Sequence, residues 1–142
     1  MRIFLLLLCF LASAALQAAD NNGNLDSLLA HRHFFQLQRE LQNDTHNLPV
    51  HRKLFYQAFL HNFFHDLVTS NKEINELLEK YKKLFTHNEI SNLLMKKIDN
   101  HVKLYQYREA HLTTELLLKK YRTATDAELI RYLSEGKVRK PN

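Results

Sequence analysis

The clearest hydrophobic pattern lies between residues 90 and 121, where apolar side chains recur every three or four positions. The first stripe consists of Ile90, Leu93, Leu94, Ile98, Val102 and Tyr105, and the second of Tyr107, Ala110, Leu117, Leu118 and Tyr121. This spacing is typical of amphipathic helices that bury one face. The pattern therefore predicts helices at 87–104 and 107–122, joined by a tight corner at Leu104, Tyr105, Gln106 and Tyr107.

The same periodicity occurs upstream and predicts more helices that come in pairs. The further expected helices are 24–31 with 33–42, 49–66 with 70–83, and a single helix at 125–135. Ser70, Thr86 and Thr125 each stand three residues before a glutamate, which is the capping-box pattern at a helix start. The segment 49–66 is apolar on two sides, which predicts a helix packed between others.

Glycine and proline are rare, with two of each in 142 residues, which argues against a turn-rich β architecture. The separation of Ser70 and Tyr107 is close to the period of helix–turn–helix repeats. We therefore predict an all-α fold of antiparallel helix pairs. The pairs form either a degenerate tetratricopeptide-like array, without the usual tryptophan and turn glycine, or a compact helical bundle.

Residues 1–19 have the pattern of a secretory signal peptide: Arg2, an apolar run from Ile3 to Leu16, and small residues at the end. The alternative is an uncleaved membrane anchor, but the run is short and no positive cluster follows it. We expect an exported protein, periplasmic or secreted, with no stable membrane insertion after cleavage. Residues 20–136 would form the helical repeat-like domain, and 137–142 a basic disordered tail.

Charge and motifs give little sign of chemistry. The net charge is +5, but Lys and Arg alternate with Glu and gather at predicted helix ends, so we expect no nucleic-acid partner. The single cysteine, Cys9, lies in the signal peptide, and the two glycines, Gly23 and Gly136, form no phosphate loop or nucleophile elbow. Acidic residues on the helices are expected to form solvated pairs with lysines at four-residue spacing: Asp66, Glu73, Glu76 and Glu115. We predict that this chain is not an enzyme.

Histidines offer one alternative function. His61 and His65 stand four residues apart in a predicted helix, a spacing that can share a metal ion. No third ligand follows at a fixed spacing, so we predict histidines at the edge of the core and neither metal nor cofactor. A small exported histidine-dependent metal-binding protein remains the alternative.

Aromatic residues offer the main hypothesis, a module that binds a peptide or protein through a groove. Most of the grouped aromatics are expected to build the core, and any exposed ones to contact a partner. The candidates for partner contact are Phe55, Tyr56, Phe59, Phe63, Tyr105 and Tyr107.

Several segments together resemble a known family. They are His33 to Leu41, Phe55 to Phe64, Ser70 to Tyr81, and Asp99 to Ala110 with its Asn100 and its Tyr107-x-x-Ala110 start. They are similar to the helical, tetratricopeptide-like region that precedes the protease domain in exported bacterial retropepsin-like aspartic proteases. The resemblance covers about residues 24–125 and implies a helical region without catalysis. A retropepsin needs an Asp-Thr/Ser-Gly loop, which this chain lacks, so no catalytic residue is carried over. A truncated fragment of such a protease is a further alternative.

Overall fold

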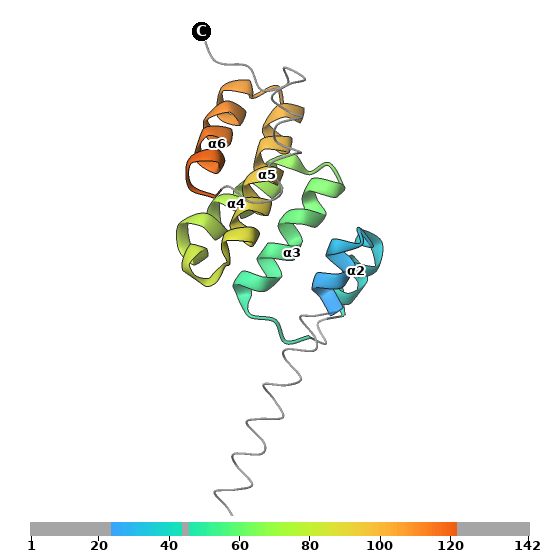
Figure 1. Cartoon of the computed structure of the whole chain (residues 1–142). Helices are drawn as coiled ribbons and strands as arrows, with labels where there is room; N and C mark the ends of the chain where they lie inside the picture. Colours follow the sequence, from blue (N-terminus) through green and yellow to red (C-terminus); the bar gives the residue numbers. More distant parts are fainter. Residues whose placement is uncertain (1–23, 44–45, 122–142) are drawn as a thin grey trace, which may run out of the picture. The chain divides into compact units, whose positions relative to one another are not determined.

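The computed structural model describes residues 24–43 and 46–121, and within them the regular structure is helical, with no strand (Figure 1). The predicted all-α fold is confirmed. The described residues fall into two compact units, 24–53 and 54–121. Three predictions concern residues outside the described ones: the signal peptide, the helix at 125–135 with its cap at Thr125, and the basic tail.

The first unit contains a helix at 24–30, helix α2 (Phe34–Gln42) and the first turn of α3 (Val50–Phe63). Its core is aliphatic and consists of Leu25, Leu28, Leu37 and Leu41. An ion pair of 2.9 Å joins Arg52 to Asp26, and a contact of 3.1 Å joins His46 to Glu40.

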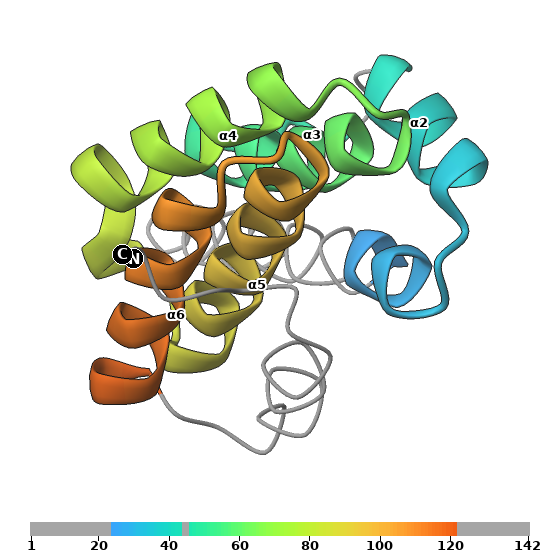
Figure 2. The ribbon, with the colours of Figure 1, turned by 90° about the horizontal axis from the view of Figure 1, so that it is seen from above.

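The second unit contains the rest of α3, then α4 (Leu67–Glu76), α5 (His87–Lys103) and α6 (Tyr107–Lys120). Helix α4 continues through a π-helical turn, η1 (Leu77–Tyr81), and a 3₁₀ turn, η2 (Lys82–Leu84). Helix α5 packs against both α4 and α6, and Figure 2 shows α5 and α6 side by side. Between α3 and α5 the predicted single helix 70–83 is thus three helical pieces that begin at Leu67.

The core of the second unit joins an aromatic cluster to an aliphatic one. Phe55 stacks on Phe85 with ring centroids 5.5 Å apart, and it also contacts Tyr56 and Phe59. The aliphatic members include Leu60, Ile74, Leu77, Ile90, Leu93, Leu94, Ile98 and Leu117. Most of the predicted stripe of α5 is therefore buried as expected, because its three-and-four spacing matches the helical period.

Three helix–helix corners share one backbone geometry. Arg32, His65 and Tyr105 have φ values of 59°, 64° and 60°. At each corner the following residue donates its N–H to the carbonyl five positions earlier: His33 to Leu28, Asp66 to His61, and Gln106 to His101. These bonds define a Schellman motif, in which the left-handed position is usually glycine. Here each of the three corners carries a side chain at that position.

Two of the predicted helix starts can be compared with the structure. Thr86 forms the full capping box with Glu89, which confirms that prediction. The predicted cap at Ser70 is wrong, because the α4 N-cap is Asp66, which accepts a hydrogen bond from the Thr69 N–H. Ser70 instead lies inside α4, fully buried, and donates to the carbonyl of Ala58 on α3 at 2.8 Å. Ser70 therefore links α4 to α3 through a buried hydrogen bond.

The predicted stripes were wrong at the corner. Tyr105 is 79% exposed, because the positive φ turns the chain out of the helix before this residue reaches the buried face. Tyr107 is also exposed. On α6 the buried face includes Thr113 and Thr114, whose hydroxyls donate to the carbonyls of Glu109 and Ala110 one turn earlier. Those bonds satisfy the hydroxyls, so two threonines can occupy a core-facing stripe.

Candidate functional site

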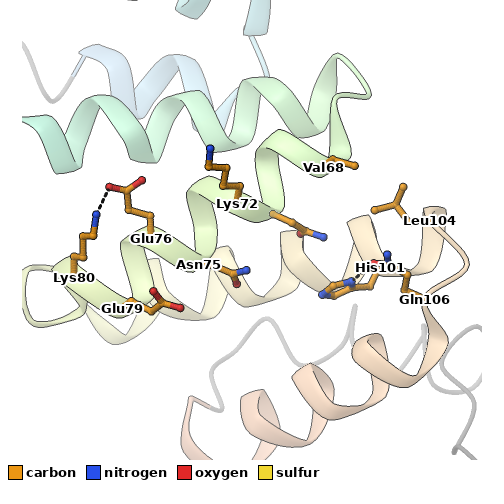
Figure 3. A pocket seen from close by; sticks show the side chains of 10 residues that line it. Val68, Lys72, Asn75, Glu76, Glu79, Lys80, His101, Leu104 and Gln106 are labelled. Atoms are coloured by element: carbon orange, nitrogen blue, oxygen red, sulfur yellow. Dashed lines mark hydrogen bonds and ion pairs between the residues drawn. The ribbon is translucent and has the colours of Figure 1, made fainter.

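A groove of about 490 Å³ runs along α4, and at one end it is lined by residues of the corner between α5 and α6 (Figure 3). We call it the α4 groove. Its lining residues on α4 and η1 are Val68, Asn71, Lys72, Asn75, Glu76, Glu79 and Lys80, and those at the corner are His101, Leu104 and Gln106. The α4 residues form rows at four-residue spacing, so they share one helix face. The groove is mixed, with amides and two apolar side chains near the corner and charges at the far end.

The orientation of Asn71 in this groove is fixed by a chain of hydrogen bonds through the core. The chain begins at the carbonyl of Ala58, which can only accept, so the Ser70 hydroxyl must donate to it. Ser70 Oγ then accepts from Asn100 Nδ2 at 2.9 Å. The same nitrogen donates to Asn71 Oδ1, also at 2.9 Å. The oxygen of Asn71 therefore faces the core, and its NH₂ is left to the groove.

The other end of the chain agrees with this direction. Asn62 Nδ2 donates to Asn100 Oδ1 at 2.7 Å and to Asp99 Oδ2 at 3.0 Å. A carboxylate only accepts, so Asp99 fixes the amide of Asn62, which in turn fixes that of Asn100. The network joins α3, α4 and α5, and its central residue, Asn100, is fully buried. A buried polar network with matched donors and acceptors holds its members in one arrangement.

Gln106 and His101 form a second oriented pair at the corner end of the groove. The Gln106 N–H donates to the His101 carbonyl at 2.8 Å, and its side-chain Oε1 lies 2.7 Å from His101 Nδ1. An amide oxygen only accepts, so Nδ1 carries the proton and donates. Gln106 therefore keeps its NH₂ for other partners, and the Nε2 of a neutral His101 is an acceptor.

His101 is neutral at pH 7. Burial lowers the pKa of its imidazole from the ordinary 6.5, and the charge of Lys97 lowers it further. The hydrogen bond to Gln106 and the charge of Glu109 raise this pKa by less. His101 is only 9% exposed, the same fraction as Asn71. Two deeply seated polar side chains thus line this end of the groove.

The far end of the groove carries balanced charges. Lys80 Nζ lies 3.0 Å from Glu76 Oε1, and this hydrogen bond raises the pKa of the Lys80 ammonium. Lys72 and Glu79 contribute one further charge of each sign, and Figure 3 shows Lys72 pointing away from His101. The groove therefore carries no net charge from its lysines and glutamates, which favours a neutral ligand over an anion.

The predicted pair of histidines does not form a metal site in the described residues. His65 lies past the end of α3 at the left-handed corner, so it is not one helical turn above His61. His61 Nδ1 contacts Glu73 Oε2 at 2.7 Å, and no group of three or more His, Cys, Asp or Glu in this part of the chain could hold a metal. Burial raises the pKa of Glu73, although His61 opposes this.

The acidic residues were predicted to form solvated pairs with lysine, and only part of this is correct. Glu76 does pair with Lys80, but Glu73 contacts His61, and Asp66 caps α4. The hydrogen bonds from Thr69 lower the pKa of Asp66. Glu115 lies 3.6 Å from His111. Of these four, Glu76 alone has a lysine four residues away as its partner. Glu115 has a histidine at that spacing, Glu73 contacts a residue of α3, and Asp66 accepts from the start of its own helix.

The six aromatic candidates for partner contact are divided by the structure. Phe55, Tyr56 and Phe59 are buried in the core. Phe63, Tyr105 and Tyr107 are exposed at the corners, where the Tyr105 and Tyr107 rings meet edge to face at 6.3 Å. Neither set lines the α4 groove, which the sequence patterns did not single out. The signal that could have found it is the asparagines at 62, 71, 75 and 100, since asparagine is a poor helix former and needs a reason to stand inside a helix.

No helix in the described part of the chain is both long and apolar enough to cross a membrane. Comparisons with protein-family models, with curated proteins and with solved structures found no match. The relation to the helical region of retropepsin-like proteases therefore stays a prediction, and the candidate site rests on its geometry.

Proposed function

We propose that this protein is an exported, non-catalytic helical module that binds an extended peptide segment of a partner protein in the α4 groove. The observation that carries the proposal is the row of amide side chains along the groove, of which Asn71 and Gln106 are oriented by hydrogen bonds. Asn71, Asn75 and Gln106 are amides, and amides can bond to both the N–H and the carbonyl of a peptide main chain. Main-chain hydrogen bonds of this kind give affinity, while neighbouring pockets give specificity.

The length of the groove fits a short peptide. Val68 and Lys80 stand twelve residues apart, and a helix rises about 1.5 Å per residue, so the lined face extends about 18 Å. An extended chain advances about 3.3 Å per residue. The groove therefore accommodates about five residues, with Val68 and Leu104 placed to contact an apolar side chain near the corner.

Selection from a library of displayed heptapeptides, with the full chain immobilised, tests this proposal. Asn75→Trp places a large ring in the middle of the groove at an exposed helix position. Lys119→Trp makes a similar change at the exposed far end of α6. We expect enriched peptides to bind the unaltered chain and Lys119→Trp, and to bind Asn75→Trp at least tenfold more weakly. Equal binding to Asn75→Trp, or no enrichment, would contradict the proposal.

Export is tested separately. When the chain is produced in a bacterial host, mass spectrometry of the product should show cleavage near residue 19 and recovery outside the cytoplasm. An intact N-terminus on a cytoplasmic product would contradict it. The relation to proteases is tested by the genomic sequence beyond codon 142, where an in-frame Asp-Thr-Gly or Asp-Ser-Gly would support the truncated-fragment alternative.

A further inference from the structure

The α4 groove contains a donor–donor–acceptor set whose chemistry goes further than a general peptide site. We propose that Asn71, Gln106 and His101 recognise a neutral carboxamide, with Nδ2 and Nε2 of the two amides donating to its oxygen and Nε2 of His101 accepting its N–H. This inference rests on the proposed function and names the group that the corner end of the groove recognises. A carboxamide occurs in every peptide unit and in the side chains of Asn and Gln.

The first argument is that each donor has a hydrogen-bond partner behind it. Reversing Asn71 would place its NH₂ against the NH₂ of Asn100. That NH₂ already donates to Ser70, and the amide of Asn100 is kept in this orientation because its oxygen accepts from Asn62. Reversing Gln106 would place its NH₂ against the proton of His101 Nδ1. Gln106 and His101 can therefore reverse only together, and the pair then still presents one donor and one acceptor to the groove.

The second argument is that the set lacks partners of its own at the groove. Among the described residues, Asn71 Nδ2, Gln106 Nε2 and His101 Nε2 make no hydrogen bond. Asn71 and His101 are each nine-tenths buried, but Asn71 Nδ2 and His101 Nε2 are not among the sealed polar atoms, so a ligand in the groove can reach them. All three residues line the same end of the groove.

The third argument is the sign of charge. Two amide donors alone would also suit a carboxylate, but a carboxylate has no N–H for His101 and prefers a cationic partner. His101 is neutral, Lys72 points away, and the lysines and glutamates of the groove balance. A carboxamide matches both the donors and the acceptor. Val68 and Leu104 then provide the apolar contact beside it.

The test uses the full chain labelled with ¹⁵N and four small probes, each titrated by NMR. N-methylisovaleramide, the methylamide, carries one secondary carboxamide like that of a peptide unit, and methyl isovalerate, the ester, replaces its N–H by oxygen. Isovaleramide carries a primary carboxamide, and isovalerate carries a carboxylate. We expect the methylamide to shift the side-chain NH₂ signals of Asn71 and Gln106 saturably, and the ester to bind about tenfold more weakly, as the loss of one hydrogen bond predicts.

Isovaleramide distinguishes the two sources of the carboxamide. Binding as tight as that of the methylamide indicates an Asn or Gln side chain, and weaker binding indicates the main chain; both support carboxamide recognition. Tighter binding of isovalerate, or equal binding of methylamide and ester, would overturn it.

Variants link the effect to the named atoms. Asn71→Asp keeps an oxygen for Asn100 but replaces the donor, and Gln106→Leu removes the other donor at an exposed position. Each should weaken methylamide binding about tenfold, whereas Lys119→Leu, the same kind of change at the far end of α6, should leave it unchanged. Unchanged binding in both groove variants would overturn the inference.

Acidification gives an independent readout. Protonated His101 becomes a donor at Nε2, so methylamide affinity should fall as pH falls below its pKa. The charged groups around His101 are Lys97 on α5, Glu109 on α6, and Lys72, Glu76, Glu79 and Lys80 of the groove. Affinity that does not fall on protonation of His101 would exclude it as the acceptor.

If displayed peptides bind in an Asn75-dependent way while all four probes fail, the proposed function stands and this inference alone is wrong.

Discussion

Asn100 Nδ2 lies 2.9 Å from Asn71 Oδ1, and this bond decides which end of Asn71 faces the groove. The same nitrogen also serves Ser70, and the oxygen of Asn100 accepts from Asn62. One buried amide therefore joins three helices and orients a residue of the candidate site.

Replacing Asn100 tests the structural half of this relationship. Asn100→Ala should lower the free energy of unfolding by about 3 kcal/mol, because it leaves buried polar groups on Asn62, Ser70 and Asn71 with fewer partners. Chemical denaturation measures the change. Lys103→Ala is the control, since its exposed pair with Asp99 should contribute at most about 1 kcal/mol. Similar losses in the two variants would show that the network does not hold the helices together.

The pH dependence of stability should report His101. Its folded-state pKa lies below the ordinary 6.5, so the unfolded chain takes up the proton first as pH falls. The stability that comes from neutral His101 is therefore full above pH 6.5 and is lost as pH falls from there toward the lowered pKa. Thermal melts of the full chain and of His101→Gln between pH 7 and 5 should show that the unaltered chain loses more stability on acidification.

The controls separate this effect from those of other groups. Asn88→Gln, at an exposed position and without an ionisable side chain, should keep the slope of the unaltered chain. Glu73 has the opposite sign: burial raises its folded-state pKa above 4.5, so the folded state takes up the proton first and acidification through that window favours folding. Identical slopes for the unaltered chain and His101→Gln would contradict the account of His101.

The corner at Tyr105 should tolerate glycine with a gain in stability. A residue with a Cβ costs roughly 1–2 kcal/mol in the left-handed region, and glycine avoids this cost. Tyr105→Gly should raise the free energy of unfolding by about 1 kcal/mol, after some loss of the contact with Tyr107. Tyr105→Ala removes the same contact but keeps the Cβ, so it should be no more stable than the unaltered chain. Equal stabilities of the two variants would mean that the backbone stores no strain there.

The capping box before α5 should have a measurable effect. Thr86→Ala removes the acceptor for the Glu89 N–H and the hydroxyl bonded to Glu89, and should cost about 1 kcal/mol in denaturation experiments. Thr86→Ser keeps the hydroxyl and should cost much less. A loss of the same size in both variants would assign the effect to the methyl group of Thr86.

Local rules predicted the fold well and the site poorly, for physical reasons. The stripe of α5 and the cap at Thr86 depend on neighbours in sequence, so periodicity and capping chemistry identified them. The network of Asn62, Ser70 and Asn100 joins residues about thirty or more positions apart, and no local sequence pattern can indicate contacts between residues so far apart. Ser70 was predicted as a cap because its spacing to Glu73 is correct, but burial against Ala58 gave it another role.

The corner residues failed for a different reason. Tyr105 continues the apolar period of α5, but its left-handed backbone ends that period one step earlier. A tyrosine gives no sequence sign of this conformation, which glycine would have given.

The hydrogen-bond chain from Ala58 to Asn71 also limits how this protein could change its ligand. A substitution at Asn71 that suits a new ligand must still accept from Asn100, and a substitution at Asn100 disturbs Ser70 and Asn62. Substitutions that change the binding preference are therefore best tolerated at Gln106 and Asn75, which are exposed and do not belong to this hydrogen-bond chain. Directed evolution of the groove should accumulate its first changes at these two positions and leave Asn71 in place.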